Sequence, residues 1–187
     1  MGNGFQQGQH ICVMYDSPEE QISTAAEYLA DGLLKGERVL YAAESRDALA
    51  RFDAALRLRG IDTEAEFMRG ALLERVHTEA HIYEGRFDSE RMLYFLSAEI
   101  ESALSGGFAG LRTCGDMSWL LNSPPGANQV VEYEVFLTQF FDRNLACGMC
   151  QYDRRRIQAM YLDAAERSHP LIVKDGSLKT NDAYRRV

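Results

Sequence analysis

The stretch "QHICVMYDSPEEQ", Gln9 to Gln21, contains a buried strand that passes directly into a helix. Its first half is a short apolar run, and its second half carries the signals of a helix start. Ser17 is the expected N-cap, Glu20 completes a capping box, and Pro18 occupies the first helical position. In many α/β proteins such a junction binds phosphate at the helix N-terminus. The alternation of strand and helix that begins here continues along the chain and therefore decides the fold class.

Short apolar runs and amphipathic stretches alternate through the rest of the sequence. We predict strands at 10–15, 38–44, 71–77, 110–119, 145–153 and 169–176, and helices at 18–35, 46–59, 63–68, 88–104, 129–144 and 154–168. This order predicts a mainly parallel sheet with helices on both faces, that is, a single three-layer α/β domain. The domain is expected to span 10–176, with a flexible N-terminus at 1–9 and a C-terminal tail at 177–187.

The predicted helix at 129–144 carries apolar residues on one face. Its apolar residues Val131, Val135, Phe136 and Phe140 recur at helical spacing. We expect these four side chains to form the stripe that faces the core.

The composition indicates a globular domain and disfavours nucleic-acid binding and membrane insertion. Apolar residues make up 46% of the 187 residues and charged residues 26%, which is typical of a globular domain. The net charge of −8 disfavours direct nucleic-acid binding, which depends on a basic face. The apolar runs are shorter than the roughly 20 residues that cross a membrane, and the N-terminus has no signal-peptide pattern. We expect a cytoplasmic protein without a membrane partner.

The first strand–helix junction lacks the groups that bind a nucleotide triphosphate. A phosphate loop needs the pattern GxxxxGK[ST], whose backbone amides and lysine face the phosphates. Here the junction has no glycine and no lysine, and Pro18 removes one amide donor. The carboxylates of Asp16, Glu19 and Glu20 would repel phosphate. ATP hydrolysis by the usual route is therefore not expected, and no cofactor is predicted.

Four cysteines, Cys12, Cys114, Cys147 and Cys150, fall in predicted strands. Cys147 and Cys150 have CxxC spacing, but residues three apart on a strand point to opposite faces. A shared disulfide or metal is therefore not expected, and core thiols are the favoured interpretation. The alternative is a sensor thiol near the strand ends, for which Cys150 is the best placed.

The histidines do not show the spacing of a hydrolytic metal site. His10 and His169 stand at the starts of two predicted strands, where a structural hydrogen-bonding role is favoured. His77 and His81 are four apart, but they fall on a strand end and its loop. We predict no metal site, and the absence of a GxSxG context leaves no catalytic residue to assign.

In an open parallel sheet, ligands bind outside the carboxyl ends of the strands. Aromatic walls with a few polar groups suit a small organic ligand. The residues predicted to bind it are Tyr15, Glu44, Asp116, Trp119 and Tyr152, with Asp153 and Arg154 at the rim. Core packing is an equal alternative for Trp119 and Tyr152, and a helix-cap role is the alternative for Asp153 and Arg154.

Several motifs together resemble a known family. They are "HICVMYDSPEEQISTAAEYLADGLLKGERVLYAAES", "GDMSWLL", "VEYE", "CQYDRRR" and "HPLIV", between His10 and Gly176. In this order they are similar to the MEDS domain, the methanogen/methylotroph sensory domain. The resemblance implies a cytoplasmic sensory domain that binds small organic molecules, a role often combined with DNA-binding, kinase or anti-sigma modules.

The same resemblance implies a RecA/KaiC-like fold without the Walker A loop. Glu44 would hold the position of a catalytic glutamate, and the lost phosphate loop would lie at 15–20. Two alternatives to a sensory domain stay open. One is a degenerate nucleotide-binding enzyme that uses Glu44 and Asp116 as acid–base groups or magnesium ligands. The other is an interaction module that forms a homodimer or docks a signalling protein.

Overall fold

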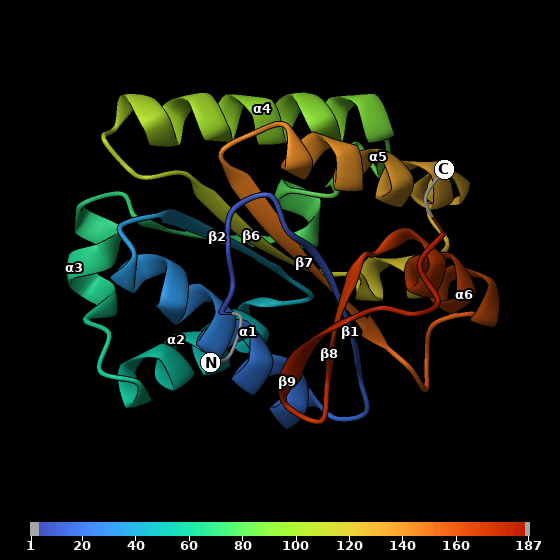
Figure 1. The fold of residues 1–187 in the computed structure, drawn as a ribbon, viewed down its shortest axis with the longest axis horizontal. Coiled ribbons are helices and arrows are strands. Elements are labelled where there is room, and N and C mark those ends of the chain that lie inside the picture. The colour runs from blue at the N-terminus through green and yellow to red at the C-terminus, as the bar shows by residue number, and fades with distance from the viewer. Residues whose placement is uncertain (1–3, 186–187) are drawn as a thin grey trace.

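The structure, a computed structural model that describes residues 4–185, is built around a seven-stranded sheet (Figure 1). The strands of this sheet are β1 (His10–Tyr15), β2 (Arg38–Ala43), β3 (Leu72–Val76), β6 (Leu111–Asp116), β7 (Ala146–Asp153), β8 (Leu171–Lys174) and β9 (Ser177–Thr180). A separate hairpin consists of β4 (Ile82–Tyr83) and β5 (Arg86–Phe87). The α-helices are α1 (Pro18–Leu34), α2 (Arg46–Leu58), α3 (Thr63–Met68), α4 (Ser89–Ser105), α5 (Val130–Asp142) and α6 (Ala159–Ser168), and the 3-10 helices are η1 (His77–Glu79), η2 (Ser118–Asn122) and η3 (Ala127–Gln129).

Helices cover both faces of the sheet, which confirms the predicted three-layer α/β domain (Figure 1). On one face α1 packs against β2 and β6, and α2 packs against β3. On the other face α4 contacts β6, and α5 contacts β1 and β7. The side chains of β7 alternate between these two cores: Cys147 lies with α1 and α2, and Cys150 lies with α4 and α5. The two cysteines therefore face opposite sides of the sheet, as predicted.

The sheet order is β3-β2-β6-β7-β1-β8-β9, and the neighbours from β3 to β8 pair in parallel. β9 pairs antiparallel with β8. Residues 177–180 therefore extend the sheet, whereas the sequence predicted only a tail at 177–187. The chain reverses there because Asp175 and Gly176 both have positive φ, as a tight hairpin requires. In the N-terminal segment predicted to be flexible, the ring of Phe5 packs edge-on against Tyr28 at 4.9 Å.

Helix α5 turns a different face to the core from the one predicted. Its buried residues are Val130, Tyr133, Glu134, Leu137 and Phe141. Phe136, which was predicted to face inward, is 53% exposed. The fully buried stripe lies about one residue away from the predicted one, and it includes a carboxylate that a purely apolar pattern passes over. Val131 and Phe140 of the predicted stripe are partly buried and pack against the same core.

Helix α6 begins at Ala159, although the sequence predicted a helix from residue 154. A turn held by Asp153 occupies the intervening residues. The backbone amide of Ile157 donates to the Asp153 carbonyl at 3.0 Å, and the amide of Arg155 donates to the Asp153 side chain at 3.0 Å. The cap alternative proposed for Asp153 matches this arrangement, except that it caps a turn.

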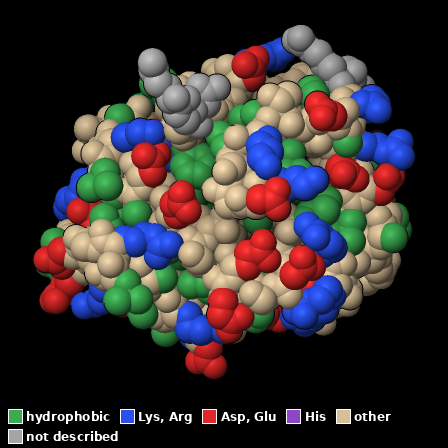
Figure 2. Space-filling view, turned by 60° about the horizontal axis from the view of Figure 1, so that its bottom comes forward, with side chains coloured by type: hydrophobic (Ala, Val, Ile, Leu, Met, Phe, Trp, Pro, Cys, Tyr) green, Lys and Arg blue, Asp and Glu red, His purple; other side chains and the backbone are tan. Residues whose placement is uncertain are grey.

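The surface does not show a single dominant charge on the face that Figure 2 presents, where acidic and basic side chains are interspersed. That distribution differs from the basic stripe that nucleic-acid binding uses. Within the described residues, no helix has the length and apolar character needed to cross a membrane.

Candidate functional site

The carboxyl ends of β1 and β6 bring Tyr15 and Asp116 together, two of the residues predicted to bind a ligand. The Tyr15 hydroxyl donates to Asp116 Oδ1 at 3.5 Å, and both side chains are buried. Asp116 also accepts the Ser118 amide at 2.9 Å and the Ser118 hydroxyl at 3.0 Å, which starts η2. His77 Nε2 lies 3.8 Å from Asp116 Oδ2. Burial raises the pKa of Asp116, and its oxygens are engaged mainly in holding the local turn.

Trp119 packs in the core beside this turn. Its side chain is only 3% exposed. The indole stacks on Phe87 at 4.7 Å and on His81 at 5.8 Å between ring centroids. The core-packing alternative for Trp119 therefore fits the structure better than pocket lining.

The charged residues of the predicted pocket form separate surface pairs. Glu44 is exposed and lies 3.9 Å from Arg156. Arg154 pairs with Asp16 at 3.1 Å, and both side chains are more than half exposed. Ion pairs of this kind contribute little to stability. The predicted residues thus lie in several groups around the strand ends and do not surround one shared pocket.

Acid should destabilise the domain through His81, which packs beside Trp119 and Gly115. Burial first, and then the nearby His77, lower the pKa of His81 to about 3. The unfolded chain takes up a proton at this residue below about pH 6.5, while the folded chain does not. His81 therefore leaves the free energy of unfolding unchanged above pH 6.5. Below that value it lowers the free energy of unfolding by about 1.4 kcal/mol per pH unit.

Urea unfolding at a series of pH values between 7 and 4.5 measures this slope. His81→Gln should reduce the slope by about one proton, because the variant has no group to titrate there. The other buried histidines contribute to the pH dependence of both proteins. The difference in slope between the wild type and the variant therefore reports the contribution of His81. Parallel curves for the wild type and the variant would contradict the assignment.

Tyr152, another residue of the predicted pocket, belongs to the core on the α4 and α5 side of the sheet, which also contains Trp119. Its hydroxyl donates to Glu134 Oε1 at 2.7 Å, and it is 1% exposed. Glu134 lies on α5 and is also 1% exposed. Buried carboxylates require partners. The side chains that surround Glu134 form a second candidate site.

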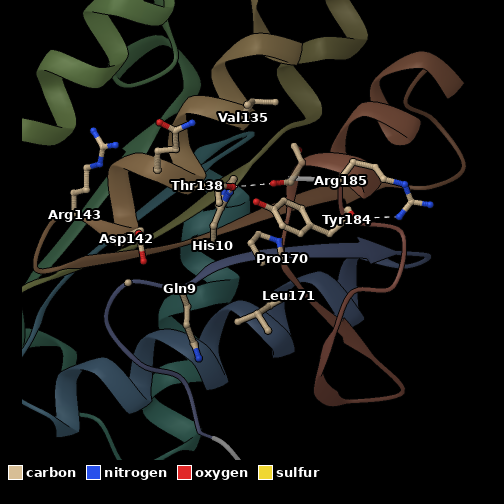
Figure 3. A pocket seen from close by; sticks show the side chains of 13 residues that line it. Gln9, His10, Val135, Thr138, Asp142, Arg143, Pro170, Leu171, Tyr184 and Arg185 are labelled. Carbon is tan, nitrogen blue, oxygen red and sulfur yellow. Dashed lines mark hydrogen bonds between the residues drawn. The ribbon is translucent and has the colours of Figure 1, made fainter. Parts of the chain in front are cut away.

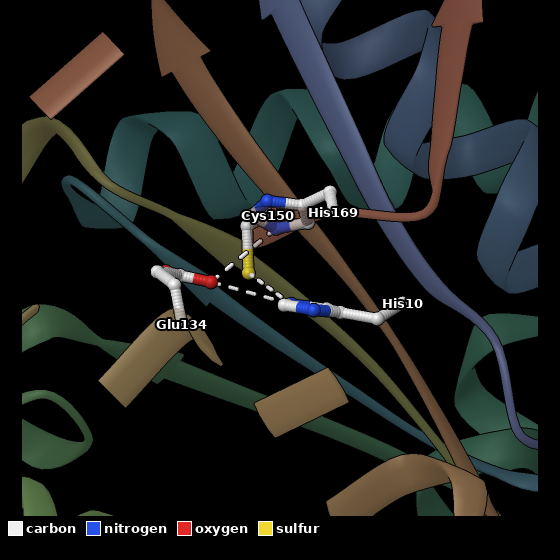
Figure 4. A group of neighbouring side chains, drawn as sticks. All are labelled: His10, Glu134, Cys150 and His169. Carbon is white, nitrogen blue, oxygen red and sulfur yellow. Dashed lines mark hydrogen bonds and ion pairs between the residues drawn. The ribbon is translucent and has the colours of Figure 1, made fainter. Parts of the chain in front are cut away.

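Around Glu134, four side chains from distant parts of the sequence point toward one another (Figure 4). They are His10 from β1, Glu134 from α5, Cys150 from β7 and His169 from the end of α6, and all four are buried. Glu134 Oε2 lies 3.2 Å from His10 Nε2 and 3.3 Å from His169 Nε2. Cys150 Sγ lies 3.6 Å from His10 Nε2. We call these four residues the His–Glu–Cys cluster.

The His–Glu–Cys cluster could hold a metal ion, because imidazole, carboxylate and thiolate are the usual protein ligands of zinc. One potential ligand atom from each residue lies within 4.8 Å of all the others. Burial, and then the adjacent His169, lower the pKa of His10 to about 4, so His10 is neutral near pH 7. Burial, and then Glu134, raise the pKa of the Cys150 thiol well above its usual range. A buried protonated thiol is unreactive, so Cys150 does not have the properties of the predicted free sensor thiol.

An open cleft of about 590 Å³ lies next to the cluster, at the amino ends of β1 and β8 (Figure 3). One wall is α5, and the opposite wall is the segment that follows β9. The lining residues include His10, Val135, Thr138, Arg143, Ser168 and Tyr184. His10 belongs to both features: its Nδ1 lies 2.8 Å from the Thr138 hydroxyl at the cleft. A cleft of this size and mixed polarity suits a small organic molecule.

The profile of the MEDS family, described as the methanogen/methylotroph, DcmR sensory domain, matches residues 9–170. This is most of the chain. The chain belongs to the MEDS family. Among curated proteins, no sequence similar to it is found.

Solved structures similar to this MEDS domain share its fold at low sequence identity. The flagellar accessory protein FlaH from Methanocaldococcus jannaschii has a TM-score of 0.65 and 16% identity, over 99% of this chain and 85% of that one. A KaiC-like protein from the hyperthermophilic archaeon Pyrococcus horikoshii OT3 has a TM-score of 0.60 and 12% identity, over 90% of this chain and 71% of that one. These similarities show that the MEDS domain has a RecA/KaiC-like fold, as the sequence resemblance implied.

In this MEDS domain the first strand–helix junction is closed by its own side chains. The Ser17 hydroxyl accepts the amide of Glu20 at 3.2 Å, and Glu20 accepts the amide of Asp16 at 2.8 Å. These bonds realise the predicted N-cap and capping arrangement. Two amides that a bound anion would use are therefore engaged within the chain.

The sequence pattern does not identify Glu134 as a candidate site residue. Glu134 ends the motif "VEYE", but the predicted apolar stripe of the helix passes through neighbouring residues. His10 and His169 were correctly given hydrogen-bonding roles, and their common partner was not foreseen. A buried carboxylate at helical register with Val130 and Leu137 is the one signal that could have pointed to the cluster.

Proposed function

We propose that this MEDS domain is a non-catalytic, cytoplasmic sensory domain that binds a small organic molecule and signals to a protein partner. The family match supports the sensory role, since that is how the family is described. The cleft at the amino ends of β1 and β8 is the binding site that the geometry favours. The residues at the carboxyl ends of the strands are a less suitable binding site, because Trp119 is packed in the core and Glu44 is paired with Arg156.

The cleft has the mixture of groups that orients a small ligand. Tyr184 offers a hydroxyl group and Arg143 a guanidinium group, while Val135 and Leu171 offer apolar surface. A neutral or anionic organic molecule of modest size matches these groups, because the lining contains Arg143 and Arg185 against one carboxylate, Asp142. Apolar contact would provide most of the affinity, and the polar groups would set the orientation.

The two walls of the cleft suggest how binding could become a signal. α5 is fixed to the sheet, whereas the segment after β9 is held mainly by hydrogen bonds. Asn181 Nδ2 donates to the carbonyls of Glu166 at 2.6 Å and His169 at 2.8 Å, and the amide of Arg185 donates to the Arg167 carbonyl at 3.0 Å. A ligand that touches both walls would favour the docked arrangement of this segment over others. A signalling protein, or a second copy of the chain in a homodimer, would recognise that difference.

Thermal unfolding with a panel of small neutral and anionic organic molecules tests the proposal. A molecule that binds the native state raises the midpoint by an amount that grows with its concentration. Val135→Trp should reduce the shift, because the larger side chain narrows the cleft. Tyr94→Trp, on an exposed position of α4, should retain it.

Two outcomes would overturn this assignment. One is a shift that survives Val135→Trp and disappears in Glu44→Ala, which would place the ligand at the strand ends. The other is the absence of any organic ligand together with a clear response to ATP and magnesium, which would favour a nucleotide-binding role. Far-UV circular dichroism of each variant confirms that it is folded.

A further inference from the structure

The His–Glu–Cys cluster places several electron-pair donors around one point. Glu134 uses Oε1 to accept the hydroxyl of Tyr152. Its other oxygen, Oε2, has no hydrogen-bond donor among the described residues and faces the Nε2 atoms of His10 and His169. The space between these three atoms is therefore a candidate position for a cation.

Hydrogen bonds on the far side of each ring decide where the imidazole protons are. His169 Nδ1 lies 2.7 Å from the carbonyl oxygen of Ala165, which can only accept. The Thr138 hydroxyl donates its proton to the Ser168 carbonyl at 2.8 Å, so it can only accept from His10 Nδ1 at 2.8 Å. In its neutral form each ring therefore carries its proton on Nδ1 and presents a bare Nε2 to Glu134.

Two bare nitrogen atoms and a carboxylate oxygen at 3.2 and 3.3 Å repel one another unless a proton on one of the rings or a metal cation lies among them. The cation cannot be supplied by a neighbouring Lys or Arg, because the described structure has no ion pair between such a residue and Glu134. This arrangement of histidines, each with Nδ1 donating to an oxygen and Nε2 directed inward, is typical of metal ligands.

We propose that His10, Glu134, Cys150 and His169 bind one divalent transition-metal ion, with Zn²⁺ as the preferred ion. Tetrahedral zinc with ordinary bond lengths places its nitrogen and oxygen ligands about 3.4 Å apart and its nitrogen and sulfur ligands about 3.6 Å apart. The observed separations are 3.2 and 3.3 Å for the nitrogen–oxygen pairs and 3.6 Å for the nitrogen–sulfur pair. These three pairs are therefore already at tetrahedral spacing, and the remaining pairs lie within 4.8 Å.

The surroundings of the cluster supply the outer contacts that a metal site needs. Tyr152 orients Glu134, Thr138 orients His10, and the carbonyl of Ala165 orients His169. Four protein ligands close the coordination sphere, which is typical of structural rather than catalytic zinc. On binding, the metal would displace the thiol proton of Cys150 to solvent.

The bound ion would join four elements: β1, β7, α5 and the end of α6. It would thereby fix α5 to the sheet beside the cleft, since Thr138 lies on α5 and contacts His10. This proposal does not depend on small-molecule binding in the cleft. A metal could be bound whether or not the cleft takes a ligand, so each proposal can fail alone.

Metal content of the full chain is the direct test. The protein is expressed in medium supplemented with Zn²⁺ or, separately, Co²⁺, so that a buried site is loaded as the chain folds. Elemental analysis after extensive dialysis should find about one metal ion per chain. The Co²⁺ protein should show the intense visible bands of tetrahedral cobalt and a thiolate-to-cobalt charge-transfer band.

Variants identify the ligands. Cys150→Ser should lose the charge-transfer band, while Cys147→Ser, on the same strand but facing the opposite core, should keep it. Glu134→Gln should retain little metal. Tyr152→Phe removes only an outer contact and should weaken metal binding about 10–100-fold, measured by competition with a chelator.

Three results would overturn the proposal: no metal at stoichiometric level in either medium, an octahedral cobalt spectrum, or identical charge-transfer bands in Cys150→Ser and Cys147→Ser. Circular dichroism establishes whether each variant is folded. If Glu134→Gln does not fold, Tyr152→Phe and the cysteine pair still decide the outcome. Loss of metal with an intact response to organic ligands would leave the proposed sensory function standing.

Discussion

Replacing Arg112 by methionine should lower the free energy of unfolding by about 3–5 kcal/mol, the usual loss when one partner of a buried ion pair is removed. Arg112 is fully buried on β6. Its guanidinium donates to Glu37 at 2.5 Å, to Asp31 at 2.9 Å and to the Tyr28 carbonyl at 3.1 Å. The variant leaves Glu37, which is only 4% exposed, without its cation. The midpoint of urea unfolding measures the loss.

Two further variants isolate the cause. Arg57→Met removes an exposed helical ion pair with Asp53 and should leave the midpoint unchanged. Combining Arg112→Met with Glu37→Leu should recover much of the loss, because no unpaired charge then remains in the core. A small effect of Arg112→Met, similar to that of Arg57→Met, would show that water reaches Glu37.

Phe141→Ala should lower the free energy of unfolding by about 3–5 kcal/mol, as truncations of buried aromatic residues do. The Phe141 ring is 1% exposed and lies 5.5 Å from the ring of His10. It fills the space beside Gly148, where an added Cβ would come within 2.3 Å of it. The truncation would leave a cavity next to the His–Glu–Cys cluster.

Phe136→Ala is the matched control, because it removes the same ring from the same helix. Phe136 is 53% exposed, so its truncation should change the urea midpoint only slightly. The pair also tests which face of α5 is buried, since the sequence pattern had assigned Phe136 to the core. A larger loss for Phe136→Ala than for Phe141→Ala would favour the pattern over the structure.

Most of the fold could be predicted because local signals agreed with the tertiary structure. The strand at 10–15, the cap at Ser17 and the helix that follows carry strong independent signals, and the structure reproduces each of them. The strands of the central sheet are short apolar runs that are buried on both sides, which periodicity identifies well. Errors arose where local signals were weak, as in the β4–β5 hairpin with two residues per strand and in the turn before α6.

The candidate site could not be predicted in the same way. Its residues come from positions 10, 134, 150 and 169, and only the order of strands in the sheet brings them together. β1 and β7 are far apart in the sequence but are neighbours in the sheet, so Cys150 and His10 meet across one strand pair. No motif spacing encodes that contact. The general rule that ligands bind at the carboxyl ends of strands also pointed to the opposite edge from the cleft.

We expect the ligand of this MEDS domain to bind in the cleft at the amino ends of β1 and β8. The most direct measurement is a titration of the ¹⁵N-labelled protein, followed by backbone amide NMR, with an organic molecule that raises the unfolding midpoint. Binding in the cleft should give saturable shifts at Gln9, Thr138 and Tyr184, with little change at the strand ends. Shifts centred on Asp16 and Asp116, with none at the cleft, would contradict it.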